Sequence, residues 1–278
     1  MAISTMDART GLEQRPRKER PGRELVADAF RVLADPVVTA LLRLGAPPPA
    51  VVLVHTAVGL AAAIAIGSGA LVVGALLLQL KTLLDNADGQ LARASGSVSV
   101  LGRYLDTEAD LLVNAAVFVA LAVAIDAWWL AIPAFCALTF LLSVDHNVAA
   151  LYDEARGRTA APLLASGSAV ERGLTLVYEA VFAPQDRLVR AFSRRRLDRT
   201  LGDEPDDTRR ERATLAYHDR GTTTVVANLG LSTQLFVLGV CLVLGAPEVY
   251  LWLVLASLLL LPVLQLRRER LARRVLAQ

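Results

Sequence analysis

The chain has 278 residues, of which 54% are hydrophobic, 5% aromatic and 20% charged. This aliphatic composition excludes an ordinary soluble domain and is typical of an integral membrane protein. The formal net charge of +2 says little about partners. We expect a lipid bilayer around the chain and no nucleic-acid partner.

The N-terminal residues 1–22 are polar and basic and contain no apolar core, which predicts a disordered cytoplasmic tail rather than a signal peptide. Residues 23–49 then carry apolar side chains at helical spacing, and Asp35-Pro36 is expected to restart the helix. This region therefore predicts amphipathic helices that lie on the membrane surface.

Six apolar stretches follow, each of about the 20 residues that a helix needs to cross a bilayer core. They lie at about 50–66, 71–92, 102–125, 128–151, 222–244 and 249–266. The expected fold is an all-α integral membrane protein with six transmembrane helices, preceded by an N-terminal amphipathic surface helix. Helices 1–4 fall within residues 50–151, and helices 5–6 with a basic C-terminus fall within residues 221–278.

Residues 152–220 form a connection longer than a helix bundle requires, which predicts a cytoplasmic loop that is either functional or disordered. Leu188, Val189 and Phe192 alternate with arginines, which is typical of an amphipathic helix on a lipid surface or of a solvated charged helix. Residues 201–212 are expected to be a solvated linker.

The arginines define an orientation. The short turns at 67–70, 126–129 and 245–249 contain no Arg or Lys, whereas the tail, the turn 93–103, the loop 152–220 and the C-terminus are rich in arginine. The positive-inside rule therefore places both termini in the cytoplasm. Arginine-heavy, lysine-poor usage indicates a bacterial inner (cytoplasmic) membrane, with the functional site facing the cytoplasm.

Four aspartates crowd the borders of two apolar stretches. Asp85 and Asp88 are three residues apart, and Asp106 and Asp110 are four apart, so each pair shares one face of its helix. Small, turn-forming residues between the pairs let the chain reverse, so the four carboxylates should meet. Divalent cations such as Mg²⁺, Mn²⁺ or Ca²⁺ would relieve their repulsion; helix caps and solvated acids are the alternative.

Small residues and one arginine accompany these carboxylates. Gly89, Ala92 and Gly102 let a bulky ligand approach the helix backbone, and the guanidinium of Arg93 suits a phosphate. Together these features predict a phosphoryl-transfer site at the membrane surface.

The segment "DNADGQLARASGSVSVLGRYLDTEAD" fits the pattern D-x2-D-G-x2-A-R-x8-G-x3-D-x3-D at every fixed position and resembles the CDP-alcohol phosphotransferase (CDP-alcohol phosphatidyltransferase) family. The resemblance implies that Asp85, Asp88 and Asp106 bind two divalent cations, Mg²⁺ or Mn²⁺, with help from Asp110. It also implies a cytidine and diphosphate pocket and a catalytic general base; the pocket residues would be Asp85, Asp88, Gly89, Ala92, Arg93 and Gly102, and the base Asp110. A homodimer is expected at the family level.

The implied reaction transfers a phosphatidyl-type group from a CDP-linked lipid, CDP-diacylglycerol first, to a small hydroxyl acceptor such as a polyol or polyol phosphate, and releases CMP. One alternative is transfer from CDP-choline or CDP-ethanolamine to diacylglycerol. Others are an ion-coupled transporter, although that would place acids near the middle of the spans, and a catalytically silent scaffold.

Other polar residues leave alternatives open. Lys81 could neutralise the aspartates, contact a phosphate or extend to the interface. Arg156, Arg158 and Arg220 could bind an acidic acceptor or only anchor the chain at the membrane. His55 and His218 show no partner and receive no role. Small-residue faces at Gly59 with Ala63 and at Ala120 with Ala124 are compatible with a dimer.

Overall fold

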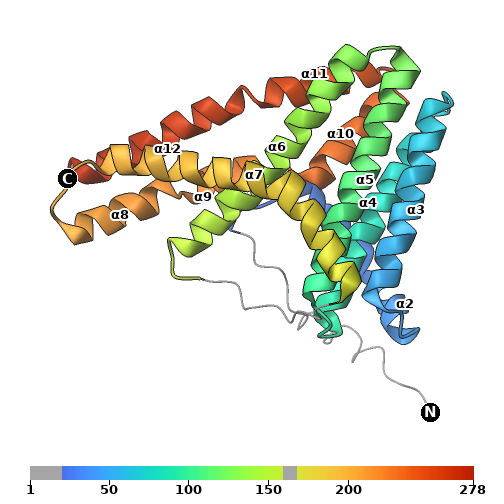
Figure 1. The fold of residues 1–278 in the computed structure, drawn as a ribbon, viewed down its shortest axis with the longest axis horizontal. Helices are drawn as coiled ribbons and strands as arrows, with labels where there is room; N and C mark the ends of the chain where they lie inside the picture. Colours follow the sequence, from blue (N-terminus) through green and yellow to red (C-terminus); the bar gives the residue numbers. More distant parts are fainter. Residues whose placement is uncertain (1–20, 159–167) are drawn as a thin grey trace.

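A computed structural model describes residues 21–158 and 168–278, and all regular structure in these two ranges is helical. The predicted tail therefore lies almost wholly outside the described residues. The helices, drawn in Figure 1, are α2 Leu25–Arg43, α3 Pro48–Gly67, α4 Leu71–Ala94, α5 Val100–Ile125, α6 Trp128–Glu154, α7 Ala169–Leu201, α8 Asp207–Tyr217, α9 Arg220–Ala227, α10 Leu231–Val243, α11 Pro247–Ser257 and α12 Leu260–Leu276.

Helices α3, α4 and α5 run side by side at one side of the molecule, with α3 at its edge (Figure 1), and α4 also packs against α2 and α10. Gly96, in the left-handed region at φ +65°, reverses the chain between α4 and α5. Such a backbone conformation strains any residue with a side chain, whereas glycine adopts it readily. The predicted reversal between the two aspartate pairs is thus confirmed.

Helix α2 is continuous through Pro36, so the predicted restart at Asp35-Pro36 is wrong. A proline inside a helix removes one backbone hydrogen bond. Here Ala34 and Val38, on either side of it, are fully buried against Ala87 of α4, and this packing holds both halves of the helix in line.

Five helical stretches in the described residues are long and apolar enough to cross a membrane. They are α3, α5, α6, the stretch Asp207–Val243 and the stretch Pro247–Leu276. Helix α4, the remaining predicted span, is about 36 Å long by its 24 residues. Its polarity sets it apart, because it carries Lys81 near its middle and Asp85 and Asp88 in its second half. Helix α4 is therefore long enough to cross a bilayer, and its charged side chains are typical of a functional site.

The predicted fifth span is split into α9 and α10 at residues 228–230. Asn228 lies at the break, where its side chain accepts a hydrogen bond from the Leu25 backbone N–H at 3.0 Å and donates one to the Arg23 carbonyl at 2.7 Å. The break therefore holds the start of α2, an arrangement that no local sequence signal predicts.

Most of the region 152–220 that the structure describes is helical rather than a loop. Helix α7 has 33 residues, and α8 begins directly after Asp206, whose carboxylate accepts hydrogen bonds from two of its first N–H groups. The second half of the linker predicted at 201–212 is therefore helical, although most of its residues are exposed as predicted. Tyr217 of α8 is fully buried with Leu201 of α7 and Ala272 of α12, so the basic end of the chain joins a small helical subdomain.

Polar contacts hold α7 against α6. Asp186 accepts hydrogen bonds from Tyr178, Ser143 and Asn147 at 2.6–2.7 Å. Burial alone would raise the pKa of Asp186, but these three hydrogen bonds bring that pKa below its usual value. Of the predicted apolar face, Val189 is buried, whereas Leu188 and Phe192 stay exposed and available to lipid or solvent.

Small residues let α3 and α5 approach closely. A Cβ added to Gly59 would lie 2.6 Å from Cγ1 of Val113. Ala63 and Ala120 are also buried in the main core. Of the expected dimer faces, Gly59, Ala63 and Ala120 are therefore used within the chain, whereas Ala124 is exposed.

We predict that Gly59→Ala lowers the unfolding temperature of the protein in detergent. Overpacking a close helix contact costs about 1–3 kcal/mol, which exceeds the roughly 1 kcal/mol that alanine gains over glycine inside a helix. Gly67→Ala is the control, because its added Cβ would lie at an ordinary 3.7 Å from Ala120. Equal unfolding temperatures for the two variants would show that the α3–α5 contact is not tight.

Candidate active site

Three helices bring four metal-ligating side chains together at one end of the bundle. One ligand atom each from His55 on α3, Asp85 and Asp88 on α4, and Asp106 on α5 lies within 4.8 Å of the others. The predicted meeting of the two aspartate pairs is thus confirmed for three of the four carboxylates. The reading of these three as separate caps or solvated acids does not hold.

His55 is a site residue that sequence reasoning missed. Its side chain is fully buried, and its Nε2 lies 2.9 Å from Asp88 Oδ2, 3.7 Å from Asp106 Oδ1 and 3.9 Å from Asp85 Oδ1. An ionisable residue inside an apolar span is a functional signal by default. The sequence contains that signal, but it does not show which face of α3 turns toward α4 and α5, because packing between the helices determines that.

Lys81 and Asp110 form the second part of the site. The Lys81 ammonium is 1% exposed and donates hydrogen bonds to Asp110 and, at 3.3 Å, to Asp85. Of the three roles open to Lys81, the structure shows charge neutralisation, and the side chain does not extend to the interface. Asp110 lies beside this ammonium rather than among the four converging ligands.

The converging ligands suit a divalent cation. Asp88 Oδ2, Asp106 Oδ1 and both ring nitrogens of His55 are buried and have no hydrogen-bond partner among the described residues. Nε2 and Asp88 Oδ2 are close but not aligned as a hydrogen bond. Buried polar atoms are rarely left unpaired, and carboxylate oxygens with an imidazole nitrogen form a usual metal-ligand set. The residues present therefore fit the divalent metal expected at this motif.

Local structure fixes the residues around the carboxylates. Ser99 caps α5 by accepting a hydrogen bond from the Gly102 N–H at 3.0 Å, which sets the register of Asp106 and Asp110.

At the end of α4, the Ala92 carbonyl accepts a turn hydrogen bond from the Ser97 N–H at 2.9 Å. Arg93 folds over Gly89, where an added Cβ would lie 3.4 Å from Arg93 Nη1. Asp106 is 43% exposed, so a soluble ligand can enter there.

The three candidate acceptor arginines differ in their surroundings. Arg156 stacks on Tyr152 and donates hydrogen bonds to the carbonyls of Tyr152, His218 and Leu215 at 3.0–3.4 Å. Arg158 is half exposed and pairs with Asp153 at 2.9 Å, and Arg220 is exposed at the start of α9. Arg156 is thus engaged in holding the fold, whereas the other two remain accessible.

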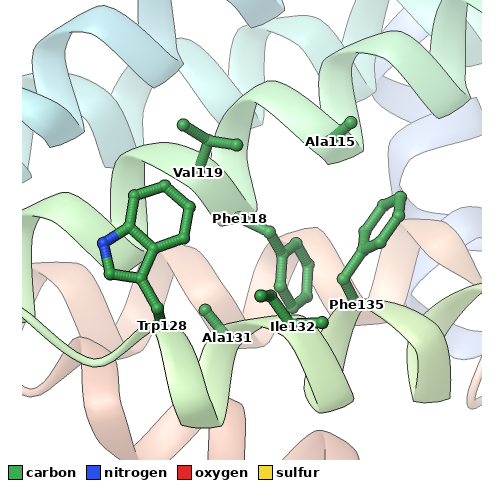
Figure 2. Close-up of a pocket in the computed structure, with 7 residues that line it drawn as sticks. All are labelled: Ala115, Phe118, Val119, Trp128, Ala131, Ile132 and Phe135. Atoms are coloured by element: carbon green, nitrogen blue, oxygen red, sulfur yellow. The ribbon is translucent and has the colours of Figure 1, made fainter.

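An apolar pocket of about 130 Å³ lies between α5 and α6 (Figure 2). Its lining includes Ala115, Phe118 and Phe135, and it holds no charged side chain. At 3.6 residues per turn, Ala115 lies half a turn around α5 from Asp106. The pocket therefore faces away from the carboxylates and is separate from the metal-ligating group.

Comparison with known proteins agrees with this site. Residues 29–171, which include the whole aspartate motif, match the CDP-alcohol phosphatidyltransferase family. The chain belongs to this family and is a membrane phosphotransferase of phospholipid biosynthesis. The family accounts for the aspartates, since it generally uses a divalent metal.

The chain is similar to several proteins named phosphatidylinositol phosphate synthase. That of Mycobacteroides abscessus is 30% identical over 158 residues, which cover 55% of this chain and 69% of that protein. That of Mycolicibacterium smegmatis is 33% identical over 154 residues, 54% of this chain and 66% of that protein. That of Mycobacterium marinum is 34% identical over 104 residues, which cover 37% of this chain and 42% of that protein. No solved structure matches the chain significantly.

We predict that Lys81→Met destabilises the metal-free protein and enlarges the stabilisation that a divalent cation gives. Breaking a buried ion pair costs about 3–5 kcal/mol, and a cation can replace the lost positive charge. The measurement is the unfolding temperature with EDTA and with Mg²⁺, for the variant and the unaltered protein. An equal metal-induced shift in both would show that Lys81 does not act on the metal-binding charge.

Proposed function

We propose that this chain transfers a phosphatidyl-type group from CDP-diacylglycerol to a small polyol phosphate and releases CMP. The observation that carries the proposal is the convergence of Asp85, Asp88 and Asp106 beside the Lys81–Asp110 pair. Family membership supports a CDP-linked donor, and the names of the relatives support a polyol phosphate such as inositol phosphate as acceptor. Glycerol phosphate is the second acceptor to test.

The residues divide the work according to their chemistry. Asp85, Asp88 and Asp106 would hold divalent cations, with Asp110 at the edge of the ligand set. The resemblance to the family implies two cations, either Mg²⁺ or Mn²⁺. Bound dications would neutralise charge that develops on the diphosphate. Gly89, Ala92 and Gly102 leave space for the cytidine and diphosphate, and Arg93 pairs with a phosphate.

Asp110 acts as the general base. It takes the proton from the acceptor hydroxyl as that oxygen bonds to the β-phosphorus, while the bond to the bridging oxygen breaks and CMP leaves. Lys81 donates to Oδ1 of Asp110. The other carboxylate oxygen, Oδ2, is therefore the one that an acceptor hydroxyl would meet.

The surroundings of the site follow from the same proposal. Large exposed apolar side chains such as Ile64, Leu76 and Trp129 would contact lipid in a bacterial inner membrane. We propose six spans, with α4 as the polar one, α2 at the membrane interface and the site facing the cytoplasm. The nucleotide head can then enter from water while the acyl tails stay in the bilayer. Assembly as a homodimer remains part of the proposal.

We predict that Asp110→Asn lowers kcat for CMP release from CDP-diacylglycerol by about 10²–10⁴-fold, the usual contribution of a general base. The assay offers labelled CDP-diacylglycerol with inositol phosphate or glycerol phosphate, and CDP-choline with diacylglycerol in parallel. Asp126→Asn, at the other end of α5, should retain full activity. Full activity of Asp110→Asn would remove Asp110 as the base, and CMP release from CDP-choline alone would overturn the proposed donor.

The arginines give a second prediction. If Arg158 binds the acceptor phosphate, Arg158→Ala should raise KM for the acceptor about tenfold or more, as expected for a lost charge-assisted hydrogen bond of 1.5–3 kcal/mol, and leave kcat and KM for the donor unchanged. The matched variant Arg156→Ala should instead lower the unfolding temperature, since three backbone carbonyls lose their donor. An unchanged KM for the acceptor in Arg158→Ala would exclude Arg158 as the residue that binds the acceptor phosphate and leave Arg220 as the candidate for that role.

A further inference from the structure

We propose that His55 is a nitrogen ligand of the metal at the aspartate cluster, and that it makes the site favour Mn²⁺ over Mg²⁺. The proposal rests on the proposed function in one respect only, namely that a divalent cation binds at this motif. The fixed positions of the motif, D-x2-D-G-x2-A-R-x8-G-x3-D-x3-D, contain no histidine. His55 comes from a different helix, α3, and lies outside this motif.

The position of Nε2 is that of a ligand rather than of a helix-packing group. It is directed at the carboxylates of three aspartates, at distances of 2.9, 3.7 and 3.9 Å. In octahedral coordination with bonds of about 2.1 Å, neighbouring ligand atoms lie about 3 Å apart and opposite ones about 4 Å apart. The four ligand atoms, all within 4.8 Å of one another, need only small side-chain rotations to share one ion.

Burial without a partner gives independent support. His55 is 0% exposed, and neither of its ring nitrogens has a hydrogen-bond partner in the described part of the chain. A buried polar group left unsatisfied costs about 1–3 kcal/mol. A leucine or isoleucine at this point of the apolar helix α3 would avoid that cost, so a bound ion gives the imidazole a role that helix packing does not.

The charges around His55 also favour a cation. Asp85, Asp88 and Asp106 lie within 4 Å of its Nε2, and the charges of Asp110 and Lys81 also act on it. Lys81 is engaged with Asp110 and Asp85, whereas Asp88 Oδ2 and Asp106 Oδ1 lie 2.9 and 3.7 Å from the imidazole Nε2 of His55. These two carboxylates and the imidazole face one another across the place where the ion would bind.

The ligand types determine the metal preference. Mg²⁺ is a hard ion that prefers oxygen ligands and keeps several waters. Imidazole suits transition metals, while carboxylates suit Mg²⁺, Ca²⁺ and Mn²⁺. Of the two metals expected at this motif, Mn²⁺ is the one that accepts both kinds of ligand. The mixed set of one nitrogen and carboxylate oxygens should therefore raise the affinity for Mn²⁺ relative to Mg²⁺.

The test is electron paramagnetic resonance of Mn²⁺ bound to the full-length protein in nanodiscs, after removal of metal with EDTA. Pulsed spectra of the unaltered protein should show ¹⁴N coupling from a directly bound imidazole, and His55→Leu should abolish it. Titration of the free Mn²⁺ signal should show about a tenfold or larger loss of Mn²⁺ affinity in His55→Leu. Competition should show a smaller change in Mg²⁺ affinity, so that the Mn²⁺ to Mg²⁺ preference falls.

The chain offers a matched control. Of its three histidines, His146 is exposed on α6 and outside the ligand group, so His146→Gln should keep the ¹⁴N coupling and the Mn²⁺ affinity. Absence of ¹⁴N coupling in the unaltered protein overturns the proposal even if His55→Leu does not fold, and coupling that persists in a folded His55→Leu overturns it too. Because the readout is metal binding, ¹⁴N coupling in a protein that releases no CMP would refute the proposed reaction and leave His55 as a ligand.

Discussion

The structure depends on the burial of several carboxylates beside an apolar bundle with a single ammonium among them. Like charges at such distances repel strongly where water is scarce. Lys81 offsets part of the charge by pairing with Asp110 and Asp85. The converging atoms His55 Nε2, Asp88 Oδ2 and Asp106 Oδ1 have no hydrogen-bond partner among the described residues. A divalent cation would resolve this arrangement, so the proposed metal would contribute to the stability of the site as well as to its chemistry.

The rest of the bundle brings α3, α4 and α5 into the positions that this site needs. Gly59 allows α3 to lie against Val113 of α5, one helical turn from His55 on one side and from Asp110 on the other. Gly96 reverses the chain between the two aspartate helices, and Ser99 fixes where α5 begins. Small residues that could have formed a dimer face are used to bring these helices close enough to share a ligand.

Much of this could be predicted from the sequence, because spacing along a helix determines which side chains share a face. The aspartate motif, the α4–α5 reversal and most span boundaries came from local patterns. His55 could not be placed, since its role depends on how α3 is rotated within the bundle. The break at Asn228 and the continuity of α2 through Pro36 depend on contacts between segments distant in sequence, namely Arg23 and Leu25 with Asn228, and Ala34 and Val38 with Ala87.

The most direct test of the account is an experimental structure of the protein with Mn²⁺ and a CDP-linked donor, in which anomalous scattering locates the metal. The account predicts a manganese ion bound by Asp85, Asp88 and Asp106, in contact with the diphosphate of the nucleotide. Aspartate side chains that point into separate environments, with the metal elsewhere or bound by none of them, would contradict it.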